Sequence, residues 1–228
     1  MDYNYIFFDC ESNSGRSHAD ILTISALFVD KNFKLIEEFN CAARLRKSRI
    51  YEIDSFLVNG MDPFEVDKHP FSNFDLTKKT NDKFVSWINK GPVLFCAHNG
   101  YQFDYMLTST HLFTNLFTWP WIFSTGNAKQ IDSLPILQNF DFYAPNTIAV
   151  ELNEKSNKTF KLGSLCRMNG FDLGDKAHTA EADTLGMSKL MELISKKNPE
   201  LFKKSISLND KKNVLSSIKD VDYFCHPE

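Results

Sequence analysis

The sequence predicts one α/β domain in which a mixed sheet is flanked by helices. Three observations predict it: strand-like apolar runs come first, strand and helix patterns then alternate, and the longest helical pattern comes near the end. The chain has 228 residues, 43% hydrophobic and 24% charged, which suffices for a packed core without disulfides or structural metal ions. Stability therefore does not require the carboxylates that interrupt the apolar runs.

Strand patterns dominate the first 43 residues. Residues 5–10 form an apolar, aromatic-rich run that predicts a buried strand. Residues 20–30 and 33–43 predict two more strands, joined as a hairpin at Asp30-Lys31-Asn32. Residues 44–76 contain turn signals such as "NGMDP", and we expect this stretch to be rich in loops.

From residue 80 the pattern alternates between helix and strand. Residues 80–90 have helical spacing that Gly91-Pro92 ends, and residues 93–99 predict another buried strand. The run "QIDSLPIL" follows a loop. Three further helices are predicted, at residues 103–113, 160–170 and 177–197, of which the last is the longest.

We assign residues 1–202 to one domain and expect a helical C-terminal extension at residues 203–228. This extension is polar and lysine-rich, with one amphipathic segment around "KKNVLSSIKDV". Two alternatives are open for it: a terminal helix packed on the domain, or a lead into a further segment.

Charge and cysteine content narrow the class of protein. A net charge of −3 argues against a protein that coats nucleic acid through a wide basic surface, but allows one that grips a strand end. The five cysteines contain no Cys-x-x-Cys pair, so neither a disulfide framework nor a zinc knuckle is indicated. No stretch approaches the roughly 18 apolar residues of a membrane span. We expect a cytoplasmic protein.

Asp9 and Glu11 end the first apolar run. Because side chains alternate along a strand, the two carboxylates share one face and repel each other unless a cation lies between them. They form the only Asp-x-Glu among the 18 aspartates. The pair alone leaves two alternatives: acids that turn into solvent at a strand end, or a site for a hard cation, whose ligands are carboxylate oxygens.

Asp104 and Asp183 stand at the starts of two predicted helices. Asp104 follows a buried strand and the Asn99-Gly100 turn, so it is either a first-turn acid favoured by the helix dipole or a ligand beyond a strand end. His178 precedes Asp183 by five positions, about 140° around a helix, so it must lie in the turn that enters the helix if it is to work beside Asp183. His178 alone could also be a capping or core residue, and we assign the rival acid Glu181 to the solvated face.

Together these residues fit two-metal phosphoryl chemistry. Two Mg²⁺ or Mn²⁺ ions roughly 4 Å apart clamp the attacking and leaving oxygens of an in-line displacement, and carboxylates hold the ions. Asp9, Glu11, Asp104 and Asp183 supply the carboxylates. His178 supplies a base whose pKa is suited to taking a proton from water.

The motifs "FDCES", "HNGYQFD" and "HTAEAD" resemble those of the DEDDh (DnaQ-like) exonucleases, ribonuclease H-like enzymes that remove nucleotides from 3′ ends. Segments such as "FKLGSLCRMNGFD" are most similar to the exonuclease domain of the exodeoxyribonuclease I branch, whereas "HNGYQFD" is closer to the small repair exonucleases. The resemblance implies a ribonuclease H-like fold, two Mg²⁺ ions for which Mn²⁺ can substitute, Asp9 bridging them, and His178 as general base.

The resemblance also implies the substrate and the groups that contact it. We expect a nucleic acid with a free 3′ end, single-stranded DNA in particular, cleaved by water to nucleoside 5′-monophosphates. Ser12, Met61, Asn99 and Phe103 match positions near the terminal nucleotide, and Phe103 can either stack on a base or belong to the core.

Three questions stay open at this point. An exoribonuclease or oligonucleotide nuclease would use the same site, and a binding module with a retired site is a further alternative, although all five positions are filled. Two basic clusters could contact phosphates or simply be solvated loops: Arg44, Arg46, Lys47 and Arg49, and Lys155, Lys158 and Lys161.

Overall fold

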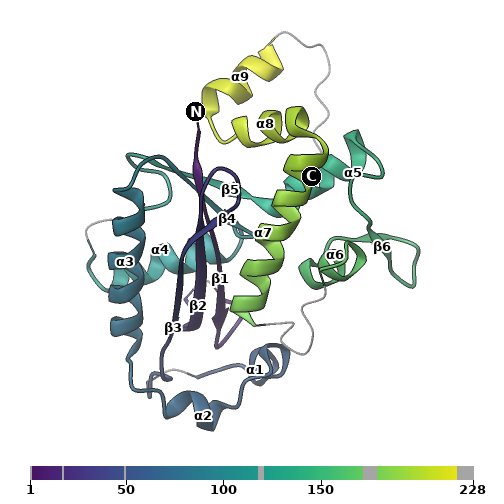
Figure 1. Cartoon of the computed structure of the whole chain (residues 1–228). Helices are drawn as coiled ribbons and strands as arrows, with labels where there is room; N and C mark the ends of the chain where they lie inside the picture. Colours follow the sequence, from purple (N-terminus) through teal and green to yellow (C-terminus); the bar gives the residue numbers. More distant parts are fainter. Residues whose placement is uncertain (1, 17, 49, 118–120, 172–178, 220–228) are drawn as a thin grey trace.

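A five-stranded mixed sheet forms the centre of the computed structural model, which describes residues 2–16, 18–48, 50–117, 121–171 and 179–219. The strand order is β3-β2-β1-β4-β5, and β1 pairs antiparallel with β2 and parallel with β4. The strands are β1 (Asn4–Ser12), β2 (Ile21–Val29), β3 (Leu35–Ala42), β4 (Val93–Ala97) and β5 (Ala128–Asp132). Helices lie on both faces of the sheet (Figure 1). The predicted α/β class is therefore confirmed.

The alternation of side chains along β1 divides the core into two parts. Ile6 and Phe8 face α3 (Asn73–Ile88) and α4 (Asp104–Thr114), whereas Tyr5 and Phe7 face the opposite layer of helices. That layer contains α5 (Ser133–Tyr143), α6 (Leu162–Met168), α7 (Ala180–Lys197) and α8 (Pro199–Ser207). β1 is thus the buried central strand, covered on both faces.

Residues 44–76 are rich in loops, as predicted, but they also include helical segments that were not predicted from the sequence. They contain α1 (Ile53–Asn59), α2 (Pro63–Asp67) and the start of α3. The sequence carried usable signals: Asp62 caps α2 with proline at the first helical position, and Ser72 and Asp75 form a capping box at the start of α3. The turn pattern "NGMDP" is the short connection between two helices, with Gly60 in the left-handed conformation that ends α1.

The C-terminal part contains short elements around the second helical layer. β6 (Glu151–Leu152) and β7 (Lys158–Thr159) form a small hairpin before α6, and α9 (Lys211–Lys219) follows α8. The predicted domain boundary after residue 202 falls within α8, and the division into domain and extension stays a prediction. In the part of the chain that is described, no helix has the length and apolar character needed to cross a membrane.

Candidate active site

Asp9 and Glu11 lie where β1 leaves the core, next to the start of α7. They continue the face of the strand that carries Tyr5 and Phe7, which pack against α7. In Figure 1 this is the lower end of the sheet, above α1. Both side chains are half-buried, so they remain open to a ligand while neighbouring groups partly exclude water.

The N-terminus of α7 brings a third acid to the pair. Thr179 caps the helix by accepting a hydrogen bond from the Ala182 amide (3.2 Å), which places Asp183 in the first turn. The hydroxyls of Thr184 and Ser25 share a hydrogen bond of 3.1 Å that fixes this turn on β2. Carboxylate oxygens of Asp9, Glu11 and Asp183 all lie within 4.8 Å of one another.

Asp104 reaches the same end of β1 from the other side. Pairing between β1 and β4 stops at Phe7 and Cys96, so the amide of Cys10 lies beyond the reach of the neighbouring strand. Asp104 Oδ1 accepts a hydrogen bond from this amide at 3.0 Å. The fourth acid is therefore buried and held by the backbone that lies between the first two acids.

The acids raise one another's pKa. Burial raises the pKa of Asp9 well above its ordinary value, and the nearby charges of Asp104 and Glu11 raise it further. Burial and then Asp183 raise the pKa of Glu11 to about 7. Burial raises the pKa of Asp104 to about 7, although the Cys10 amide opposes this rise. Such a cluster is unfavourable when fully ionised, and divalent cations would remove the repulsion.

The residues fit a divalent cation by their chemistry and their placement. The donors are carboxylate oxygens, which are the ligands that Mg²⁺ and Mn²⁺ prefer. Asp9, Glu11 and Asp183 could hold one ion, and Asp9 with Asp104 a second one. Glu181 is exposed, as expected for the solvated face. The predicted general base, His178, lies outside the described residues.

The four residues predicted to bind substrate lie in different surroundings. Ser12 is buried, and its hydroxyl donates to the Ser14 carbonyl (2.7 Å). Phe103 is partly buried against the core, in agreement with the alternative that it is a core residue and does not stack on a base. Met61 is half-buried just after α1, and Asn99 is exposed with a positive φ of 57°. Their contacts with a substrate stay a prediction.

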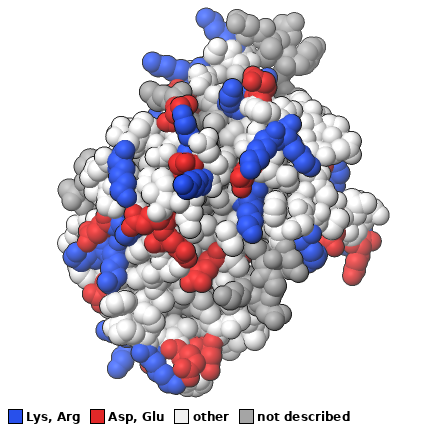
Figure 2. All heavy atoms as spheres, in the orientation of Figure 1, with Lys and Arg blue, Asp and Glu red and all other residues white. Residues whose placement is uncertain are grey.

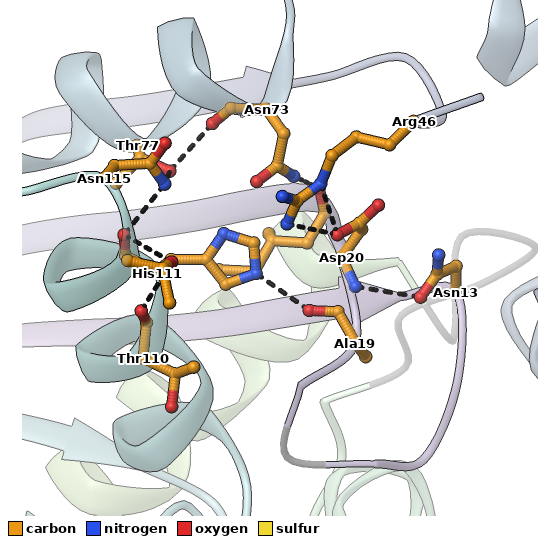
Figure 3. Close-up of polar contacts among 11 residues, drawn as sticks. Asn13, Ala19, Asp20, Arg46, Asn73, Thr77, Thr110, His111 and Asn115 are labelled. Carbon is orange, nitrogen blue, oxygen red and sulfur yellow. Dashed lines mark hydrogen bonds and ion pairs between the residues drawn. The ribbon is translucent and has the colours of Figure 1, made fainter. Parts of the chain in front are cut away.

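The first basic cluster is attached to the end of the sheet that carries the acids. Arg46 makes an ion pair of 2.5 Å with Asp20, whose side chain is fully buried (Figure 3). The Asp20 amide in turn donates to Asn13 Oδ1 (2.9 Å), two residues after Glu11. Arg44 donates to the Pro70 carbonyl. In this cluster, Arg49 lies outside the described residues.

Charges of both signs are interspersed over the face shown in Figure 2, without a continuous basic stripe. In the second basic cluster, Lys158 pairs with Asp141 at 2.6 Å.

One residue of the site region escaped the sequence reasoning. Asp132 ends β5, is 4% exposed and accepts hydrogen bonds from the turn that precedes Asp104. The order Asp-Ser before an apolar run is typical of a helix N-cap, and that signal in "QIDSLPIL" could have placed it.

No family model matches the sequence. A curated relative, exodeoxyribonuclease I of Buchnera aphidicola (subspecies Schizaphis graminum), is 26% identical over 98% of this chain and 45% of its own length. Escherichia coli exonuclease I in complex with a dA16 oligonucleotide superimposes with a TM-score of 0.86 at 18% identity, over 94% of this chain and 45% of that one. The chain has the exonuclease I fold.

A second solved structure agrees with the first. Exonuclease I from Methylocaldum szegediense matches with a TM-score of 0.86 and 16% identity, over 96% of this chain and 46% of that one. The resemblance to exodeoxyribonuclease I and the ribonuclease H-like fold are thus confirmed. The chain spans about half the length of the relatives it matches, so the activity of those whole proteins is carried over only as a proposal.

Proposed function

We propose that this chain is a 3′-to-5′ exonuclease that hydrolyses single-stranded DNA to nucleoside 5′-monophosphates with two divalent cations. The observation that carries the proposal is the convergence of Asp9, Glu11 and Asp183 within 4.8 Å, with Asp104 bound to the same strand end. The exonuclease I fold supports it, and two of the matched structures are exonuclease I with bound oligonucleotides.

In this proposal each acid has a distinct part. Asp9 would contribute to both cation positions, Glu11 and Asp183 would hold one cation with it, and Asp104 would hold the other. When bound, the cations lower the pKa of the attacking water and stabilise the leaving 3′ oxygen. His178 accepts the proton that the water loses, a role that requires a pKa near neutrality.

We propose Mg²⁺ as the physiological cation, with Mn²⁺ as a substitute, and the cytoplasm as the location. Four carboxylates that meet at one strand end suit both ions. One of the matched structures is a zinc-bound form of an E. coli exonuclease I complex with single-stranded DNA. Comparing turnover with Mg²⁺, Mn²⁺ and Zn²⁺ at equal concentrations tests the choice of ion.

The deciding experiment is a degradation assay on end-labelled single-stranded and double-stranded DNA and single-stranded RNA, with Mg²⁺ or a chelator. We expect a 5′-labelled DNA strand to shorten from its 3′ end, and a 3′-labelled strand to release its label at once as a mononucleotide. Chelation should stop both reactions. Faster cleavage of RNA than of DNA would show that RNA is the preferred substrate, and the proposed two-cation mechanism would be unchanged.

The control is a matched pair of aspartate variants. Asp9→Asn removes the proposed bridging carboxylate, whereas Asp82→Asn removes an exposed one whose partners, Lys78 and Asn81, lie on α3. We expect the first variant to be inactive and the second to match the wild type. Equal hydrolysis by Asp9→Asn and wild type would overturn the metal assignment, and no hydrolysis by any of the proteins would favour a binding module.

A further inference from the structure

The connection between β4 and α4 places the fourth acid, and it passes over the end of β5. The two strands are parallel, and Ala97 is in register with Asp132, so they end side by side. From Ala97 the chain has only six residues in which to turn and begin α4 at Asp104. The position of the Asp104 carboxylate therefore depends on the conformation of this short turn.

Asp132 holds the turn through backbone amides. Its Oδ1 accepts hydrogen bonds from the amides of Asn99 (2.8 Å) and Leu134 (2.9 Å), and its Oδ2 accepts one from Tyr101 (3.2 Å). Hydrogen bonds from an N–H to a buried carboxylate are stronger than those between neutral groups. A single side chain thus caps α5 and fixes both ends of the Asn99–Tyr101 turn.

The turn itself has little freedom to relax. Asn99 adopts a positive φ of 57°, and a Cβ on Gly100 would lie 2.3 Å from the Cβ of Ala97. The Gly100 carbonyl accepts hydrogen bonds from the amides of Phe103 and Tyr105, both at 3.1 Å. A shift of the turn is therefore transmitted directly to the first turn of α4.

We propose that Asp132 is a positioning residue for the proposed exonuclease reaction, because it fixes the Asn99–Tyr101 turn and thereby aims Asp104 at its cation position. The inference rests on the proposed function for the role of Asp104. Groups that hydrogen-bond directly to a metal ligand typically change metal affinity or activity by about 10–100-fold when they are lost. Asp132 acts through the turn and not on the Asp104 carboxylate itself, so we expect an effect at the lower end of this range.

Asp132→Asn is the most selective variant. Asparagine keeps one oxygen for the Asn99 and Leu134 amides, but presents an NH₂ group to the amide of Tyr101, where two donors repel each other. We expect the affinity for one of two Mn²⁺ ions, measured by calorimetry without DNA, to fall about 10-fold. The Mg²⁺ concentration for half-maximal hydrolysis should rise by the same factor.

A second variant disturbs the same turn without altering Asp132. Gly100→Ala forces the turn away from Ala97 and should also weaken one Mn²⁺ site selectively. Asp82→Asn is the charge-matched control. It should bind both Mn²⁺ ions with wild-type affinity and hydrolyse DNA at the wild-type rate. Circular dichroism at the assay temperature establishes that each protein is folded.

The outcomes separate the inference from the proposed function. Unchanged Mn²⁺ isotherms in folded Asp132→Asn and Gly100→Ala would overturn the positioning role, as would an equal weakening of both ions. A wild-type protein that binds two Mn²⁺ ions but hydrolyses no nucleic acid would overturn the proposed function. In that case the Mn²⁺-binding isotherms of the variants would still test whether Asp132 positions Asp104 for cation binding.

Discussion

The two halves of β1 differ in what surrounds them, although they belong to one strand. From Tyr5 to Phe7 the backbone pairs with β2 on one side and β4 on the other, and the side chains of this half, up to and including Phe8, are buried among apolar groups. From Asp9 to Ser12 only the pairing with β2 continues, with a register shift between Glu11 and Ser12. The first half supports the fold, and the second half exposes a polar strand end to which other elements contribute acids.

The difference shows how a reactive site can be attached to a stable strand. The mutual repulsion and burial of the carboxylates raise the pKa of Asp9 and Glu11, so the second half destabilises the metal-free fold near neutral pH. The apolar half, which packs between two layers of helices, offsets this penalty. Substitutions in the apolar half should therefore lower stability and leave activity unchanged, whereas substitutions of the acids should lower activity and can raise the stability of the metal-free protein.

The largest effect is expected from Asp9→Asn. Its carboxylate is the one that both proposed cation positions share, so hydrolysis should fall by more than the roughly 100-fold that loss of an outer-shell partner can cause. Initial rates on a 5′-labelled single strand at saturating Mg²⁺ measure the change. A rate within threefold of the wild type would show that the acid end of β1 is not where the reaction occurs.

Phe8→Ala tests the apolar half. The ring is fully buried and packs against Phe84, Phe95 and Phe123, so its removal leaves a cavity. We expect the free energy of unfolding in urea to fall by about 3–5 kcal/mol, with the rate per folded molecule unchanged. A destabilisation below about 1 kcal/mol would contradict the division of tasks between the two halves.

Glu11→Gln should stabilise the metal-free protein at alkaline pH. The folded protein raises the pKa of Glu11 from its ordinary value to about 7, so the contribution of Glu11 to wild-type stability is fully present below pH 4.5 and is lost as the pH rises through 7. Glutamine does not titrate, and at pH 8 the variant should be more stable by on the order of 2 kcal/mol.

Mg²⁺ should reverse this order, because it stabilises the wild type in proportion to its binding. Thermal unfolding at pH 4 and pH 8, with a chelator or with Mg²⁺, measures both effects. A Glu11→Gln variant that is less stable than the wild type at pH 8 without metal would contradict the repulsion argument.

The smallest effect is expected at the start of α7. Thr179→Ala removes the cap on the helix that presents Asp183, and loss of such a cap lowers stability by about 1 kcal/mol. We expect a modest fall in melting temperature and a smaller fall in rate than any acid variant shows. Thr179→Ser, which retains the hydroxyl, is the matched control and should restore both.

Local sequence patterns predicted where the acids lie along the chain, but not the contacts between distant segments. Alternation along a strand placed Asp9 and Glu11 on one face, and helix-start patterns placed Asp104 and Asp183 at element ends. These are local rules, and they located all four acids. The bond from the Cys10 amide to Asp104 joins residues 94 positions apart, so no local pattern could reveal it.

The missed elements have a different cause. α1 and α2 have seven and five residues, too few for a periodic pattern to stand out, and only their capping signals mark them. α3 begins seven residues before the predicted position because its first two turns carry polar residues as well as Phe74 and Leu76. Buried polar partners such as Asp132 were missed because burial depends on the packing of distant strands.

The most direct test of the metal assignment is the position of Mn²⁺ in a crystal of the wild-type protein soaked with the ion and a nucleoside 5′-monophosphate. We expect two anomalous peaks roughly 4 Å apart at the end of β1, with the Asp9 carboxylate in contact with both and His178 facing the phosphate. A single peak, or peaks that Asp9 does not touch, would contradict the two-metal site.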